Sequence, residues 1–296
     1  SVGSFVLHNY ALNDTESVEL IDNNNINNLL VSFRSTEGED ISLSSGWTTD
    51  NDYDLDVYRN EITVTFHNMF DNKQITKALT FYPDKYIIDI NVDLSTIQHQ
   101  VSQGVTTVSW PGGLPLTEPN KKDEHIYYQA MLFQGDEIYT PKPKKLVQAK
   151  LERMDYPTDW VAIRTKYFIS ALVPKKQAPG SEVLAIEEND NILYNVGMYF
   201  EVDRPFSSTL YLGPLEYERI KLLGRNLDRT MNFGWAFIRP ISKIVHWFLL
   251  FLYKYIPNYG FVLIVFSVFV KILVYPLTNK SYTSTKKMQA IQPMLN

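Results

Sequence analysis

The sequence predicts a mainly β protein, in which an antiparallel β-sandwich body is followed by an amphipathic helix and one transmembrane helix. Three observations predict it: runs of alternating apolar and polar residues, a change to helical spacing after Gly224, and a sharp difference in charge between two parts of the chain. The 296 residues are 45% hydrophobic and 21% charged, so the chain is able to bury a core. A disordered chain is therefore not expected.

The part of the chain before Gly224 is predicted to form mostly strands. In KYIIDINVDL, Ile88, Ile90 and Val92 alternate with polar residues, which predicts one buried and one wet face. The pattern recurs in EITVTFHN, GVTTVSW, NILYNVGMYFEV and SSTLYLG, and turn signals such as WPGGLP lie between such runs. The segment WVAIRTKYFISALV, which starts at Trp160, fits a helix or a strand, and the sequence does not decide between the two.

The net charge of −5 hides two parts of opposite sign. Residues 231–296 hold seven Lys or Arg and no Asp or Glu, so they carry +7. The preceding part holds 21 basic and 33 acidic residues and carries −12. This asymmetry is typical of an acidic body joined to a tail that meets a membrane.

Cysteine is absent, which excludes disulfides and thiolate metal sites. The opening SVGSFVLHNY lacks the basic region and apolar run of a signal peptide. If the acidic body lies outside the cytoplasm, an upstream segment is therefore expected, and the abrupt end at QPMLN also suggests a fragment.

Residues 235–255 are predicted to form an amphipathic helix, because polar residues recur at helical spacing and apolar residues cover the other side. The polar face has basic residues and no acids, which favours a helix in the bilayer interface over one packed on the β body. A spanning helix is not expected, because the uninterrupted apolar core from Trp247 to Tyr253 is too short. The residues expected at the membrane interface are Arg239, Lys243, Trp247, Tyr255 and Tyr259.

Pro257 and Gly260 mark a break, after which the chain is able to cross a bilayer. A helix over 260–278 is about 28 Å long, close to the hydrocarbon thickness of about 30 Å. Tyr275 and Tyr282 are placed for the far interface. Basic residues flank both ends, so their count does not decide which end is cytoplasmic, whereas an exported domain before the helix would place the tail inside.

One cation, Lys271, lies in the second half of this apolar span, where a charge costs several kcal/mol unless it finds water or a partner. One interpretation is that its stem reaches toward the headgroups near Thr278. The other is a wet or protein-lined cavity, favoured because the polar residues share one helical stripe. The stripe consists of Ser267, Lys271, Tyr275, Thr278 and Tyr282.

The residues around Lys271 resemble a known family. The segment YGFVLIVFSVFVKILVYPLTNKSYTSTKKMQAIQPML is similar to the first core helix and hairpin start of membrane protein insertases of the YidC/Oxa/Alb family. The specific part is YPLT followed by YTS, KM and QP. Upstream, LYLGPLEYERI, NFGWAFIRPISKIVHWF and DWVAIRTKYFISALVP resemble the family's periplasmic domain and interfacial helix.

The resemblance implies four regions of the chain. They are a periplasmic antiparallel β-supersandwich at 1–224, a linker and amphipathic interfacial helix at 225–258, a transmembrane helix of the insertase core at 259–279, and the start of a cytoplasmic hairpin at 280–296. It also implies a bacterial inner-membrane protein, multi-pass in full length, with 1–258 on the periplasmic side and 280–296 in the cytoplasm.

The resemblance further implies a function without catalysis, the insertion and folding of nascent inner-membrane proteins. Five core helices would enclose a hydrophilic groove whose cation attracts the substrate's translocated tail. Lys271 takes the position where the family usually has arginine, so the charge is kept and arginine's planar fork is lost. The groove residues expected to bind substrate are Lys271, Ser267, Tyr275 and Thr278.

The expected partners are nascent membrane proteins and the lipid bilayer, with Sec translocon components and the ribosome in the full-length protein. No cofactor, metal or specific nucleic-acid binding is expected. The alternative is a membrane-tethered carbohydrate-binding or mutarotase-like periplasmic domain, for which the last helix is an anchor. An anchor needs no polar stripe, whereas an insertase needs further apolar spans after Asn296.

The segment TDNDYDLDVYRNE has the acidic spacing of an EF-hand calcium loop. Leu55 replaces the glycine that its sharp turn needs, and Glu61 opens a strand instead of a helix. A solvated acidic loop is therefore expected. The acidic residues concerned are Asp50, Asp52, Asp54, Asp56 and Glu61.

Overall fold

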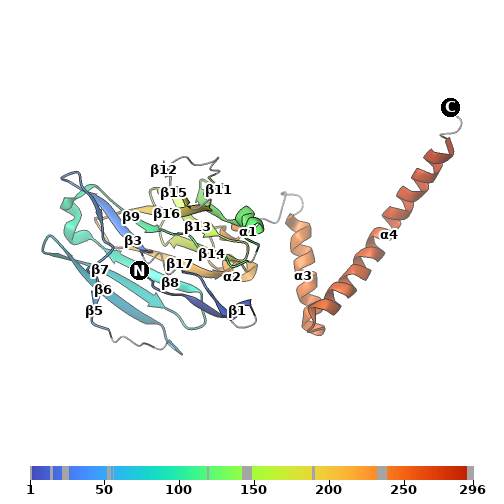
Figure 1. The fold of residues 1–296 in the computed structure, drawn as a ribbon, viewed down its shortest axis with the longest axis horizontal. Helices are drawn as coiled ribbons and strands as arrows, with labels where there is room; N and C mark the ends of the chain where they lie inside the picture. Colours follow the sequence, from blue (N-terminus) through green and yellow to red (C-terminus); the bar gives the residue numbers. More distant parts are fainter. Residues whose placement is uncertain are drawn as a thin grey trace. The chain divides into compact units, whose positions relative to one another are not determined.

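The computed structural model describes the chain except for residues 1, 14–15, 22–26, 52–54, 56, 119, 142–148, 189–190, 232–238 and 292–296. The chain forms two compact units, residues 1–230 and 231–296. The first unit is built mainly from antiparallel strands and the second contains two helices, so the predicted fold class is confirmed (Figure 1).

The first unit contains two large sheets in which all neighbouring strands are antiparallel. The larger has nine strands in the order β11 (Glu137–Tyr139), β10 (Gln129–Gln134), β13 (Thr158–Arg164), β14 (Phe168–Pro174), β17 (Phe206–Pro214), β8 (Ile87–Asp93), β7 (Lys73–Phe81), β6 (Ile62–Phe70) and β5 (Thr48–Thr49). The smaller has six in the order β12 (Lys150–Met154), β15 (Ser181–Glu188), β16 (Asn191–Glu201), β9 (Val101–Trp110), β3 (Leu30–Ser35) and β4 (Asp40–Ser42).

Shorter elements complete this unit. Strands β1 (Val6–Asn13) and β2 (Glu16–Glu19) pair only with each other among the described residues. The short helices η1 (Ser95–Gln100) and α1 (Lys121–Tyr127) lie between strands, and α2 (Tyr217–Leu222) and η2 (Leu227–Thr230) follow the last strand.

The hydrophobic core joins the two sheets in one cluster of buried side chains. In β8, Ile88, Ile90 and Val92 are buried and the residues between them are more exposed, as the alternation predicts. The smaller sheet contributes Val31 and Val108 to the same cluster. The five runs predicted as strands are found in β6, β8, β9, β16 and β17.

The segment WVAIRTKYFISALV, for which the sequence allowed a helix or a strand, forms most of the hairpin of β13 and β14. Every residue of β14 is buried, which is why its sequence lacks the alternation of a strand with one wet face. The segment of α2 and η2 lies against the neighbouring strands: the indole N–H of Trp160 donates to the Arg225 carbonyl at 3.0 Å, and the Arg229 guanidinium lies 5.2 Å from the Phe133 ring centre.

Strand β6 departs from the predicted burial. Ile62, Val64 and Phe66 are only half-buried, because β6 is followed in the sheet only by the two-residue strand β5. Fewer neighbours at this edge leave the apolar face of β6 partly open.

A lysine lies inside the larger sheet. Lys77 of β7 is 3% exposed, its ammonium lies 4.5 Å from the centre of the Trp47 ring, and it donates to the Leu29 carbonyl at 3.5 Å. Burial lowers the pKa of Lys77 from 10.5 to about 8, so the group is still charged at neutral pH.

Replacing Lys77 by methionine should change how stability depends on pH. The unfolded chain holds the Lys77 proton up to a higher pH than the folded one, so charge burial destabilises the fold fully below pH 8 and is relieved as the pH rises toward 10.5. The stability gained by Lys77→Met should therefore shrink by roughly 3 kcal/mol between pH 7 and pH 10.5, at about 1.4 kcal/mol per pKa unit. Urea unfolding followed by tryptophan fluorescence measures it.

The exposed Lys85 is a matched control, because Lys85→Met removes a lysine without relieving burial. Its stability difference from the unchanged chain should stay constant over the same range. A pH-independent difference for Lys77→Met would contradict a buried charge.

Candidate functional site

The second unit is a pair of helices joined by a short turn, α3 (Arg239–Tyr255) and α4 (Tyr259–Ile291) (Figure 1). The Asn258 side chain begins α4 by accepting from the backbone N–H of Gly260 at 2.9 Å. Among the described residues, α4 is the one helix long and apolar enough to cross a membrane, over Tyr259–Pro276. Its 33 residues span about 50 Å, so it exceeds the hydrocarbon thickness of about 30 Å.

The four predicted groove residues lie on one face of α4 and all are exposed in this chain. The Ser267 hydroxyl donates to the Leu263 carbonyl at 2.8 Å and the Thr278 hydroxyl to the Val274 carbonyl at 3.1 Å. Such bonds to the carbonyl one turn back satisfy a hydroxyl in apolar surroundings. The Lys271 ammonium makes no hydrogen bond or ion pair with the part of the chain that the structure describes.

Helix α3 packs on a different face of α4. The Phe248 ring lies 4.7 Å from the ring of Phe269 and 6.2 Å from that of Phe266, and Val262 is fully buried. The Tyr253 and Tyr259 rings stack at 4.2 Å beside the turn. These contacts define an α3-facing side of α4 that carries Val262, Phe266 and Phe269.

The polar stripe lies opposite this α3-facing side. At about 100° per residue, Lys271 is about 180° around the helix from Val262, nine positions earlier. Ser267 and Tyr275, each four positions from Lys271, stay within about 40° of it. Helix α3 therefore leaves Lys271 uncovered.

The pattern of α4 alone did not identify its α3-facing side. Phe266, Phe269 and Val262 lie in a segment that is apolar nearly all round, so periodicity marks no contact face. The only asymmetry along this segment is its polar stripe, so the side opposite the stripe is the one signal that could have pointed to the contact.

The predicted interface residues are distributed over both helices. Lys243, Trp247 and Tyr255 are exposed on α3, and Trp247 stacks on Phe251 at 5.6 Å. Tyr259 is also exposed, although its ring stacks on Tyr253 of α3. The side chain of Arg239 lies outside the described residues. Trp247, Phe251 and Tyr255 thus form an exposed aromatic row along α3.

The structure adds little on metal chemistry. Among the described residues, no group of three or more His, Asp or Glu side chains is placed to hold a metal ion. Three acids of the candidate calcium loop, Asp52, Asp54 and Asp56, lie outside the described residues.

Comparison with known families places the chain. A family model described as the YidC periplasmic domain matches residues 1–248, and a model described as 60Kd inner membrane protein matches residues 251–296. The chain belongs to the YidC family. The resemblance drawn from the residues around Lys271 is therefore confirmed.

Two curated relatives illustrate the extent of the match. The membrane protein insertase YidC of Chlorobium luteolum is 32% identical over an alignment of 236 residues, which covers 75% of this chain and 40% of the relative. That of Prosthecochloris aestuarii is 30% identical over an alignment of 312 residues, gaps included, which covers 99% of this chain and 52% of the relative. The chain thus spans about half the length of the curated relatives it matches.

Solved structures give a much weaker likeness. An α-N-acetylgalactosaminidase from Bifidobacterium bifidum is 11% identical with a TM-score of 0.43, over 71% of this chain and 34% of that one. A likeness at this level carries no argument about function.

The sides on which α3 and α4 contact each other predict which cysteine pairs will crosslink. Phe248→Cys with Phe269→Cys should react with a short bifunctional thiol reagent, because these side chains meet between α3 and α4. The chain has no native cysteine to give background. Mass spectrometry of the digested product measures the linked peptides, with the chain in detergent micelles.

The pair Phe248→Cys and Lys271→Cys is the matched control. Position 271 lies only two residues from position 269 along the chain but on the opposite side of α4, so this pair should react far less. Equal yields from the two pairs would contradict the assignment of the α3-facing side.

Proposed function

We propose that this chain is the periplasmic domain and first core helix of a membrane protein insertase that inserts and helps fold nascent inner-membrane proteins. The observation that carries the proposal is a lysine without a partner among the described residues, at the centre of a polar stripe turned away from α3. The YidC relatives, which are named membrane protein insertases, support it.

The depth of Lys271 along α4 supports a hydrated cavity over snorkelling. Lys271 is twelve residues after Tyr259, or about 18 Å along the helix. With Tyr259 at one interface, the far boundary of the hydrocarbon is about 12 Å further on. A lysine stem reaches roughly 6 Å, and helical side chains lean back toward the N-terminus, away from that boundary. The stem alone therefore leaves the ammonium in the hydrocarbon.

The mechanism follows from electrostatics. A cation attracts a carboxylate 4 Å away by about 1 kcal/mol in bulk water and by about 4 kcal/mol at the effective dielectric constant of about 20 near a protein surface. A groove around Lys271 would therefore draw in the acidic or polar tail of a nascent protein. The apolar segment of that substrate then moves into lipid, driven by hydrophobic transfer. No covalent bond changes.

The groove requires helices beyond this chain. Helix α3 contacts the side of α4 opposite Lys271, so the stripe has no cover from the described part of unit 231–296. The remaining core helices of the full-length protein would supply the other walls. This explains why the stripe is exposed in the chain as it stands.

A plain membrane anchor for a carbohydrate-binding domain explains the length of α4 but not its stripe. An anchor surrounded by lipid gains nothing from Ser267, Lys271 and Tyr275 on one face, and Lys271 alone costs it several kcal/mol. The insertase accounts for both features.

The insertase places the chain in the bacterial inner membrane, with residues 1–258 on the periplasmic side and 280–296 in the cytoplasm. Residues Lys243, Trp247 and Tyr255 of α3 then lie at the membrane interface, where aromatic rings and lysine stems are stable. Nascent membrane proteins and the bilayer are the partners, with Sec translocon components and the ribosome as further partners of the full-length protein.

Charge reversal at Lys271 tests the proposal in the full-length protein. Lys271→Glu should lower the insertion of a client with an acidic translocated tail at least about tenfold, because the attraction of about 4 kcal/mol exceeds the 1.4 kcal/mol that a tenfold change needs. Lys271→Arg should insert normally, since it keeps the charge. Protease protection of the client tail in proteoliposomes measures insertion.

Lys254→Glu is the matched control, because it reverses an exposed lysine of α3 that lies outside the stripe. It should insert the client at nearly the unchanged rate. Equal insertion by Lys271→Glu, Lys271→Arg and the unchanged protein would rule out the groove mechanism.

A further inference from the structure

A cavity of about 390 Å³ lies on the β unit, within the range of about 300–1,000 Å³ typical of ligand sites. Its lining combines apolar side chains with three charged ones, Glu118, Lys166 and Glu216. The segments that line it come from β1, β2, the loop before α1, the turn between β13 and β14, and the end of β17. Sequence patterns gave no sign of it, because these segments are far apart along the chain.

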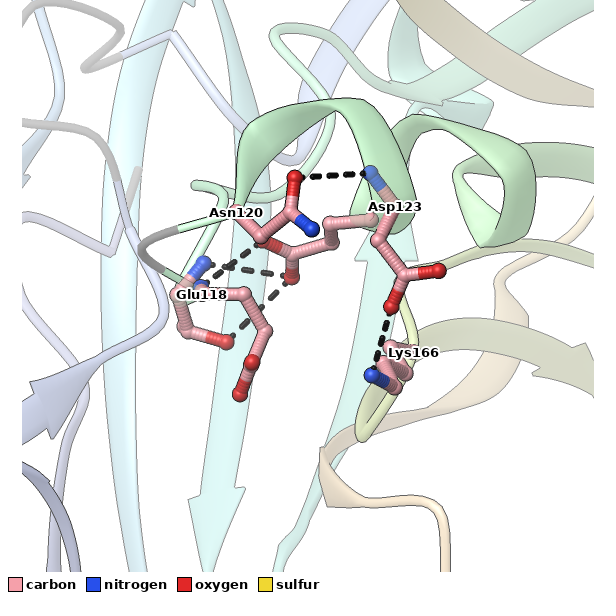
Figure 2. Close-up of polar contacts among 6 residues, drawn as sticks. Glu118, Asn120, Asp123 and Lys166 are labelled. Atoms are coloured by element: carbon pink, nitrogen blue, oxygen red, sulfur yellow. Dashed lines mark hydrogen bonds and ion pairs between the residues drawn. The ribbon is translucent and has the colours of Figure 1, made fainter.

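Helix α1 holds one part of the lining in place. Its Glu124 is fully buried, and the carboxylate accepts from the Thr117 backbone N–H at 3.2 Å, the Thr117 hydroxyl at 3.3 Å and the Glu118 backbone N–H at 2.8 Å. These bonds fix the backbone of the loop that carries Glu118. In Figure 2 the Glu118 side chain extends away from α1, and no dashed line reaches its carboxylate.

The same helix holds the lysine of the cavity. Asp123 of α1 accepts from the Lys166 ammonium at 2.8 Å, and this ion pair raises the pKa of Lys166 (Figure 2). The Tyr167 ring lies 5.3 Å and the Tyr127 ring 5.9 Å from the same ammonium. Lys166 is therefore already neutralised by a partner outside the cavity lining.

Of the three charged side chains in the lining, one carboxylate has no partner among the described residues. Glu216 accepts from the Tyr10 hydroxyl and from the Arg219 guanidinium at 2.6 Å, so it is neutralised like Lys166. The half-buried Glu118 carboxylate makes no hydrogen bond or ion pair with any residue that the structure describes. The lining thus carries a net negative charge at a single defined place.

We propose that this cavity binds the lysine or arginine side chain of a partner polypeptide, with its cation on Glu118. Apolar residues of the lining, such as Leu12, Val18 and Pro214, suit the aliphatic stem of such a side chain. The exposed Tyr167 ring offers a face to the cation. A carboxylate, an aromatic face and apolar lining together match a long cationic side chain better than an anion or a neutral apolar group.

Two further features favour a polypeptide over a free amine. Strand β1, which lines the cavity through Tyr10 and Leu12, pairs only with β2 among the described strands, so its other edge has no strand partner there and could pair with an extended chain. The part of the chain before residue 231 also carries −12, which steers basic segments toward it. The site does not depend on the insertase proposal.

Peptide titration of the whole chain in detergent micelles tests the site. The probes are blocked pentapeptides, acetyl-Val-Thr-X-Val-Thr-amide, in which X is lysine, norleucine or glutamate, and free 1,4-diaminobutane. Calorimetry should give a dissociation constant for the lysine peptide at least about tenfold below those of the other probes. Glu118→Gln should raise the lysine-peptide value to that of the norleucine peptide, and Glu37→Gln, the same change at an exposed carboxylate outside the cavity, should leave it unchanged.

The Glu118 side chain makes no hydrogen bond or ion pair with the described residues, so Glu118→Gln should fold normally, and its thermal unfolding checks this. Equal binding of the lysine and norleucine peptides, or binding that survives Glu118→Gln, would overturn the proposal. So would diaminobutane that binds as tightly as the lysine peptide, or no binding of any probe. Loss of client insertion by a Lys271 variant would leave this result untouched.

Discussion

The positive charge of Lys271 on an otherwise apolar helix is the constraint on which the membrane part of the chain depends. A charge at that depth is stable only beside water or a partner, whereas the described part of the chain offers it neither a carboxylate nor a helix on its side. Because α3 packs on Phe266 and Phe269 instead, α4 has a closed apolar side and an open polar one. In the proposed insertase, this polar side is the one that the remaining core helices would cover.

The buried cations of the β unit differ from Lys271, because each contacts a partner within the fold. Lys77 lies over the Trp47 ring, and the buried Arg164 donates to the Thr230 carbonyl at 2.6 Å. The Arg164 bond joins β13 to the last residue of the unit, so it fixes the point from which the chain continues toward α3. These cations stabilise position and geometry within the fold, and they are closed to outside partners.

The sequence predicted those features whose physical cause is local. Alternation in β8 reflects one buried and one wet face, and the stripe around Lys271 reflects helical spacing alone. The sequence did not decide between helix and strand for the segment that forms β13 and β14. Because β14 is buried throughout, only tertiary contacts distinguish such a strand from a buried helix. The cavity beside Glu118 is built from five separate segments, so no spacing in the sequence marks it.

Charged groups that have no partner within the described chain are therefore the most direct guide to where the chain contacts other molecules. Most acids and bases of the β unit that line or surround the cavity are paired, as Lys166 is with Asp123 and Glu216 with Arg219. Glu118 and Lys271 have no such partner among the residues described, although one is half-buried in a cavity and the other lies on a helix suited to the bilayer. A fold retains such a group at a cost unless a partner neutralises it. The opposite signs of the two groups agree with the different partners that we propose, a cationic side chain for the cavity and an acidic or polar tail for the groove.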